Sequence, residues 1–154
     1  MRIRILMLGK NKGRFINEGV ADFLKKLRPF CELELIFIKD EKVHGDVPKL
    51  LNDEAKRILK HLNPDEFLIV LDEKGKSFRT VELSNVFLKL QDSGRAHFTF
   101  LIGSAHGLSI DIKEQADLLL SLSPLTMNHQ IVRLVLLEQL YRIFTIQRGI
   151  AYHK

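Results

Sequence analysis

The chain has 154 residues, of which 45% are apolar and 28% charged, as expected for one soluble globular domain spanning residues 1–154. Cys31 is its only cysteine, which excludes an internal disulfide and a thiolate metal cluster, and we predict no metal. No run approaches the roughly 20 apolar residues of a membrane span, and the opening apolar run is too short for a signal peptide. We therefore expect a cytoplasmic protein that is not bound to a membrane.

Apolar runs typical of buried strands alternate with segments of helical periodicity. In chain order we expect a strand at 3–8, a helix at 14–27, a strand at 33–38, a helical segment at 47–62, a strand at 67–71, a turn at 72–76, a helix beginning at Thr80, a strand at 98–102, a short helix around 111–117, a strand at 118–122 and a helix at 129–147. This alternation predicts an α/β fold, with a mostly parallel sheet and helices on both faces.

The last expected helix, 129–147, is apolar nearly all the way round. Such a helix must be covered on nearly all sides, whereas one small sheet covers only one side. A second subunit is the simplest source of the remaining cover, so we expect a homodimer. The alternative is a central helix wrapped by its own chain.

Charge is unevenly distributed along the sequence. Residues 1–30 contain eight Lys and Arg against two acidic residues, and residues 129–154 contain four against one, whereas the middle of the chain is mildly acidic. Two basic ends suit a polyanionic partner such as a nucleic acid. The alternative is that both are ordinary solvated surfaces.

Three expected strands are followed by loops that suit ligand binding: "LDEKGK" (71–76), "IGSAHG" (102–107) and "LSPLTMNHQ" (122–130). The second lacks the lysine of a phosphate-binding P-loop, and Gly9 and Gly13 are too far apart for a dinucleotide fingerprint. It suits an aromatic ligand with polar edges held by backbone groups, or else a tight turn that binds nothing. Pro124 makes the third loop irregular, so its buried backbone groups need partners, and a small molecule is one candidate.

The stretches "FLIGSAHGLS", "LSLSPLTMNHQIVRLVLLEQLYRIF" and "RGIAYHK" closely resemble the RlmH family of SPOUT-superfamily methyltransferases. The resemblance implies a C-terminal trefoil knot, a homodimer and S-adenosyl-L-methionine as cofactor. It also implies methylation of N3 of a pseudouridine in the helix 69 loop of 23S ribosomal RNA, within the assembled ribosome. The implied cofactor pocket consists of Leu71, Gly103, Leu122, Ser123, Pro124, Leu125, Thr126 and Met127. The chain departs from the family pattern at Ser104, often glycine, and at Asn128, often proline.

Methyl transfer to an imide nitrogen requires an oriented acceptor and removal of a weakly acidic proton. The resemblance makes Arg142, Tyr152 and His153 the catalytic candidates. His153 would accept the proton, Tyr152 would stack on the base, and Arg142 would stabilise negative charge. Alternatively, Arg142 only pairs with Glu138 on its helix and the last residues are a disordered tail. His129 opens the last expected helix and is either a site residue or a capping and packing residue, and His106 either faces RNA or is a solvated loop residue.

Lys10, Lys12 and Arg14 follow the first strand, and with Arg148 and Lys154 they are expected to line one surface for RNA phosphates. Each is otherwise an ordinary solubilising residue. In the dimer, the tail of one subunit is expected to complete the pocket of the other. Two other functions stay open: methylation of a tRNA base, and a non-catalytic RNA-binding module with the same fold.

Overall fold

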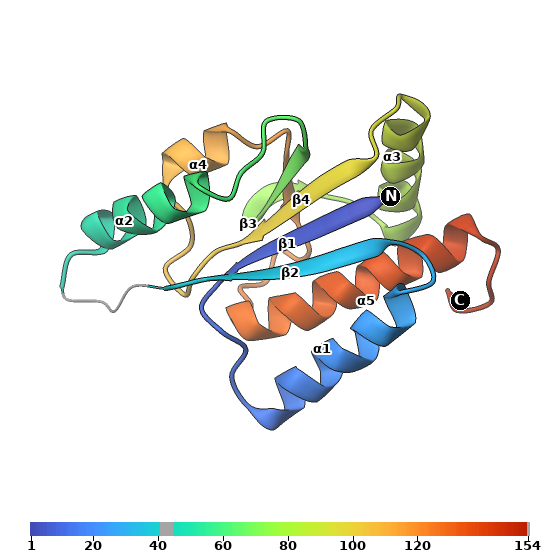
Figure 1. The fold of residues 1–154 in the computed structure, drawn as a ribbon, viewed down its shortest axis with the longest axis horizontal. Coiled ribbons are helices and arrows are strands. Elements are labelled where there is room, and N and C mark those ends of the chain that lie inside the picture. The colour runs from blue at the N-terminus through green and yellow to red at the C-terminus, as the bar shows by residue number, and fades with distance from the viewer. Residues whose placement is uncertain (41–44, 154) are drawn as a thin grey trace.

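The computed structural model describes residues 1–40 and 45–153, and five strands in it form one sheet in the order β2-β1-β4-β3-β5 (Figure 1). Every strand pairing is parallel. The elements are β1 (Arg2–Leu8), α1 (Arg14–Leu27), β2 (Glu32–Ile38), α2 (Val47–Leu59), β3 (Phe67–Ser77), α3 (Thr80–Asp92), β4 (His97–Ile102), α4 (Ile110–Glu114), β5 (Leu118–Ser121) and α5 (His129–Gln147).

Two apolar layers cover the two faces of the sheet. Successive side chains of a strand point to opposite faces, and β1 divides accordingly. Ile3, Ile5 and Met7 join the larger core with α1, α3 and α5, whereas Leu6 and Leu8 join the smaller core with α2 and α4. The predicted α/β architecture, a parallel sheet with helices on both faces, is therefore confirmed (Figure 1).

Helix α5 lies in the middle of the larger layer, in contact with α1 and α3 (Figure 1). The approach to α1 is close: a Cβ atom on Gly19 would lie 2.8 Å from Leu134 Cδ2. Within α5, Ile131 is the one large apolar side chain that is clearly exposed, at 39%. The cover that the sequence analysis assigned to a second subunit therefore comes largely from the chain's own helices. The homodimer remains a prediction.

The predicted turn at 72–76 is wrong, because β3 continues to Ser77 through an irregular stretch. Leu71 and Lys76 both pair with Leu120, so residues 72–75, here named the bulge, leave the ladder. Gly75 permits this path, since a Cβ there would lie 2.7 Å from the Leu119 carbonyl oxygen. The predicted fourth helix, 111–117, also ends earlier, because the Asp117 carboxylate accepts a hydrogen bond from the Leu68 amide at 2.7 Å.

None of the helices within the described residues has the length and apolar character needed to cross a membrane.

Candidate methyl-donor pocket

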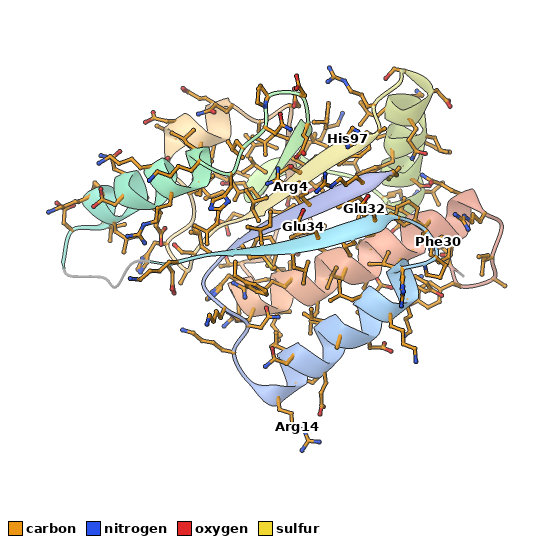
Figure 2. All side chains as sticks on the ribbon, viewed as in Figure 1. Arg4, Arg14, Phe30, Glu32, Glu34 and His97 are labelled. Atoms are coloured by element: carbon orange, nitrogen blue, oxygen red, sulfur yellow. The ribbon has the colours of Figure 1, made fainter. Side chains whose placement is uncertain are left out.

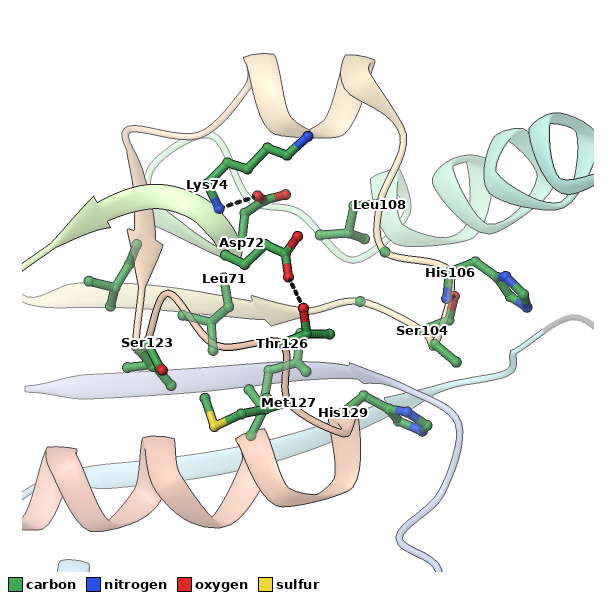
Figure 3. A pocket seen from close by; sticks show the side chains of 18 of the residues that line it. Leu71, Asp72, Lys74, Ser104, His106, Leu108, Ser123, Thr126, Met127 and His129 are labelled. Carbon is green, nitrogen blue, oxygen red and sulfur yellow. Dashed lines mark hydrogen bonds between the residues drawn. The ribbon is translucent and has the colours of Figure 1, made fainter.

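A pocket of about 420 Å³ opens at the carboxyl ends of β4 and β5, beside the bulge of β3 (Figure 3). Three segments line it: the bulge with Leu71, residues 103–107 (the glycine loop) and residues 122–128 (the polar loop). His129 and Val132 from the first turn of α5 also line it, and the remaining wall residues are Ile102, Leu108, Lys113 and Leu120. The position agrees with the rule that ligands of open parallel sheets bind beyond the carboxyl ends of the strands. The volume is that of a small-molecule site.

The structure brings together seven of the eight residues predicted for a cofactor pocket. Those lining the pocket are Leu71, Gly103, Leu122, Ser123, Leu125, Thr126 and Met127. Pro124 is exposed and is not among the lining residues. Its effect is on the path of the polar loop, since its ring fixes φ and removes a backbone donor.

The glycine loop is held in a shape that side chains would disturb. A Cβ atom on Gly103 would lie 2.8 Å from the Gly107 carbonyl oxygen and 2.9 Å from Leu108 Cγ. Gly107 has φ +81°, in the left-handed region that glycine adopts without strain. The Gly107 amide donates to the Ser104 carbonyl at 3.0 Å, which closes the turn. The two glycines thus bring bare backbone to the pocket wall.

Hydroxyl and amide side chains satisfy the irregular backbone of the polar loop. Ser121 Oγ donates to the Ser123 carbonyl at 3.0 Å, and the Leu125 amide donates to Ser123 Oγ at 3.0 Å. Asn128, one of the departures from the family pattern, caps α5 by accepting from the Gln130 amide at 2.8 Å. The sequence analysis expected buried backbone groups of this loop to need partners, and the chain's own side chains supply some of them.

One hydrogen bond joins two walls of the pocket. Thr126 Oγ1 on the polar loop donates to Glu73 Oε2 on the bulge at 2.8 Å (Figure 3). The two segments are 53 residues apart in sequence. The bond fixes the polar loop against the bulge at the pocket wall.

The charges at the pocket are nearly balanced. Asp72 and Lys113 form an ion pair at 2.5 Å, and Glu73 and Lys74 also line the wall. Burial by itself raises the pKa of Asp72, but bonds from Lys113 and the Lys74 amide hold the pKa below its usual value. Burial, followed by the charges of Arg133 and Lys12, lowers the pKa of His129, so this imidazole is neutral at neutral pH. Such a pocket is not built for a chain of phosphates.

The three catalytic candidates lie together, but away from the pocket. Arg142 Nε donates to Glu138 Oε1 at 2.9 Å, and the Arg142 guanidinium lies 4.7 Å from the centre of the Tyr152 ring. His153 Nδ1 is 3.4 Å from Arg142 Nη1, and Tyr152 Oη donates to Glu138 at 3.3 Å. These four residues are named the tail cluster. Val132 at the pocket is ten residues before Arg142 on α5, a separation of about 15 Å.

The tail is ordered as far as His153 because local contacts hold it. The Ile150 amide donates to the Thr145 carbonyl at 2.8 Å, and the Tyr152 ring packs edge-on against Tyr141 with centroids 4.8 Å apart. Burial, then Glu138, raises the pKa of Tyr152, which therefore stays a neutral phenol. The disordered-tail alternative is wrong for residues 148–153, while the Arg142–Glu138 helical pair does form.

The basic residues expected on one surface lie at two separate places in the chain. Gln130 accepts from the Lys12 amide at 3.0 Å and donates to the Lys10 carbonyl at 3.1 Å, which fixes this loop beside the pocket residue His129. Arg148 lies 4.7 Å from the centre of the Phe30 ring, beyond the opposite end of α1. The prediction that these residues line a single RNA-binding surface within one chain is therefore wrong (Figure 1). Lys154 lies outside the described residues.

Arg133 is a functional candidate that the sequence analysis missed. Its side chain is 1% exposed and donates to the carbonyls of Leu8 at 2.6 Å and Gly9 at 3.0 Å, and to Asn11 Oδ1 at 2.8 Å. It thereby ties the start of α5 to the end of β1, from which the basic residues follow. The sequence feature that could have revealed Arg133 is a cationic residue on the inward face of an apolar helix.

Among the described residues, no cluster of three His, Cys, Asp or Glu side chains is arranged to hold a metal.

Figure 2 shows the side chains of the described residues and places Arg14 at the outer end of α1, away from Phe30, which lies just beyond that helix's other end. Comparison with known proteins identifies the family of the chain. The family model described as predicted SPOUT methyltransferase matches residues 1–153. Proteins named ribosomal RNA large subunit methyltransferase H, from Halothermothrix orenii, Carboxydothermus hydrogenoformans and Streptococcus gordonii, are each 40% identical over 159 aligned positions covering both chains completely. A probable methyltransferase from Bordetella pertussis has a similar fold, with a TM-score of 0.57 at 13% identity over 93% of this chain and 96% of its own. The chain belongs to the SPOUT methyltransferase family.

Proposed function

We propose that this protein is a cytoplasmic enzyme that transfers a methyl group from S-adenosyl-L-methionine to N3 of a pseudouridine in the helix 69 loop of 23S ribosomal RNA, within the assembled ribosome. The observation that carries the proposal is the pocket, where the glycine loop, the bulge and the polar loop meet. Full-length relatives named ribosomal RNA large subunit methyltransferase H support the class of substrate.

The residues at the pocket fit S-adenosyl-L-methionine. When bound, this cofactor supplies a methyl group activated by a sulfonium. Leu71, Leu122 and Met127 offer apolar surface to an adenine ring, and the bare backbone at Gly103 allows close approach. The balanced wall charges suit a ligand that carries a positive sulfur, an ammonium and a carboxylate, but no phosphates.

The separation of the pocket from the tail cluster supports a homodimer. Side chains about 15 Å from the pocket on the same helix cannot reach a substrate held there. A second subunit would bring its own tail to this pocket and would place its Arg148 near the first subunit's Lys10, Lys12 and Arg14. We therefore propose a composite site in which each pocket uses the partner's tail.

Within this composite site each tail residue has a distinct role. His153 accepts the N3 proton, and Arg142 stabilises the negative charge that develops on the imide. Tyr152 packs against the target base or binds its edge. Glu138 holds Arg142 and Tyr152 in place before the substrate arrives, because it accepts a hydrogen bond from each. Lys10, Lys12 and Arg14 contact phosphates beside the pocket.

We also propose that the C-terminal segment forms the trefoil knot of this superfamily. The polar loop links β5, paired with β3, to α5, which packs on the face of the sheet opposite α4. An experimental structure with continuous density for residues 100–147 tests the threading. An unthreaded path for the polar loop would contradict it.

Labelled methyl transfer from S-adenosyl-L-methionine to ribosomes, isolated subunits and tRNA tests the substrate. We expect label in 23S ribosomal RNA of the assembled ribosome, at one pseudouridine. Label in tRNA alone would make the enzyme a tRNA methyltransferase. Calorimetry showing no heat with millimolar cofactor would favour a non-catalytic RNA-binding module.

A further inference from the structure

A carboxylate outside the pocket is bonded to the glycine loop. Glu54 is 1% exposed and lies on α2, whose Ala55 and Ile58 belong to the smaller apolar layer of the sheet. Ser104 Oγ donates to Glu54 Oε2 at 3.0 Å across 50 residues of sequence. Burial raises the pKa of Glu54, the Ser104 bond and His106 oppose this, and Asp40 adds to it. A buried carboxylate is costly, so its position calls for a physical reason.

Ser104 provides the side-chain anchor of the glycine loop. Among residues 103–107, all of which are described, Gly103, Ala105 and Gly107 have no polar side chain, and His106 is exposed. The Ser104 hydroxyl bonds Glu54, its carbonyl accepts from the Gly107 amide, and its Oγ lies 3.4 Å from the His106 amide. Three groups around the loop are thus bonded to one residue, two through its hydroxyl and one through its carbonyl, and Figure 3 shows this residue at the pocket edge beside His106.

We propose that Glu54 is a positioning residue for methyl-donor binding: through Ser104 it holds the glycine loop in the shape that presents the Gly103 backbone to the pocket. The inference rests on the proposed donor function of this pocket. Glu54 itself is not among the residues that line the pocket, so it acts through Ser104 and does not touch the donor.

The effect follows from conformational entropy. A five-residue loop with two glycines has many accessible conformations when it is not tethered. Glu54 is fixed on a packed helix, so the bond to Ser104 removes that freedom before the donor arrives. Without the bond, binding of the donor must also order the loop. The apparent affinity for the donor is then the intrinsic affinity multiplied by the fraction of molecules whose loop already has the binding shape. The chemical step at saturating donor is unaffected.

Calorimetric titration of the full-length protein with S-adenosyl-L-methionine tests this role. We expect Ser104→Ala to raise the dissociation constant about tenfold, the size of one hydrogen bond to a charged group. Glu54→Gln keeps an oxygen that can accept from Ser104, so we expect a rise below about threefold. In turnover, Ser104→Ala should raise KM for the donor about tenfold and leave kcat within about twofold.

Ser109→Ala is the matched control. Its hydroxyl follows the same loop, is buried, and has no hydrogen-bond partner among the described residues. We expect its donor affinity to equal that of the wild type. The double variant Glu54→Gln/Ser104→Ala should bind donor no more weakly than Ser104→Ala alone, because both changes act on one bond.

Three outcomes would overturn the inference. The first is Ser104→Ala that binds donor as tightly as the wild type, with or without a lower Tm, which would make the bond merely structural. The second is an equal loss in Ser109→Ala. The third is a wild-type protein that gives no heat with the donor, which would remove the proposed function of the pocket and this inference with it; the first two would leave that function intact.

Discussion

The two ends of α5 are built in different ways. At its start, the pocket is formed by bare backbone, glycines and capped turns, and the buried Arg133 ties the helix to β1. At its other end, the tail cluster consists of partly exposed charged and aromatic side chains held by Glu138. The first end has the features of a rigid small-molecule site, whereas the second presents chemical groups to a large substrate. Binding and chemistry are therefore expected to respond separately to mutation.

The largest separation should come from the tail. Replacing His153 with Ala, or deleting residues 152–154, removes the proposed base, so turnover should fall by about 100-fold or more. Donor affinity should stay within about twofold, because no tail residue of the same chain lines the pocket and the partner's tail is proposed to act on the target base, not on the donor. Single-turnover methyl transfer and calorimetric titration measure the two quantities. Unchanged turnover would remove the tail from the catalytic site.

Mixed dimers test whether the two ends of α5 act across subunits. Gly103→Val fills the pocket wall, and deletion of residues 152–154 removes the tail, so each homodimer should be nearly inactive. A heterodimer isolated with two different tags keeps one intact pocket facing one intact tail, and should recover about half of wild-type turnover per dimer. No recovery in a stable heterodimer would contradict the composite site.

A matched pair of glycine variants isolates the pocket's contribution. Gly107 has φ +81° and Gly94 has φ +87°, and a Cβ atom added at either would meet nothing within 4 Å. Alanine at either should cost about 1–2 kcal/mol of stability, because both adopt the left-handed region. Only Gly107→Ala should weaken donor binding, about fivefold to tenfold, since Gly94 lies before β4 and away from the pocket. Thermal unfolding and calorimetric titration check both, and equal effects on the donor would oppose a direct role for the loop.

The smallest expected effect concerns RNA phosphates. Lys12→Ala should weaken ribosome binding several-fold and reduce the slope of its salt dependence by about one, while donor affinity stays the same. Lys60→Ala is the control, because Lys60 is exposed at the end of α2, on the opposite face of the sheet from α1 and α5. Filter binding at several salt concentrations measures this. An identical salt slope in both variants would place the RNA elsewhere.

Much of the fold and part of the site follow from local sequence. The apolar runs locate the five strands, and helix 14–27 is predicted to the residue, because short apolar runs and the period-3.6 pattern of an amphipathic helix are local properties. Gly103 and Gly107 mark the tight turn at the pocket for the same reason. The irregular part of β3 could not be predicted in this way, since "DEKGK" has the composition of a turn, and the strand extends beyond it only because Lys76 and Ser77 pair with β5.

Contacts between distant segments could not be derived from any local pattern. The bond between Ser104 and Glu54 joins residues 50 positions apart, and that between Thr126 and Glu73 joins residues 53 apart. The cover of α5 by α1 and α3 is of the same kind, and it replaces the argument that an apolar helix requires a second subunit.

The order of residues along the chain thus settled which segments are strands, which are helices and where the backbone turns tightly, because nearest neighbours control these features. Only the packed chain decided which loops share a wall and that the pocket and the tail cluster lie at opposite ends of one helix. The reason is physical: a pocket depends on the distance between atoms in space, and residues far apart in sequence approach each other only when the sheet and its two helix layers have formed.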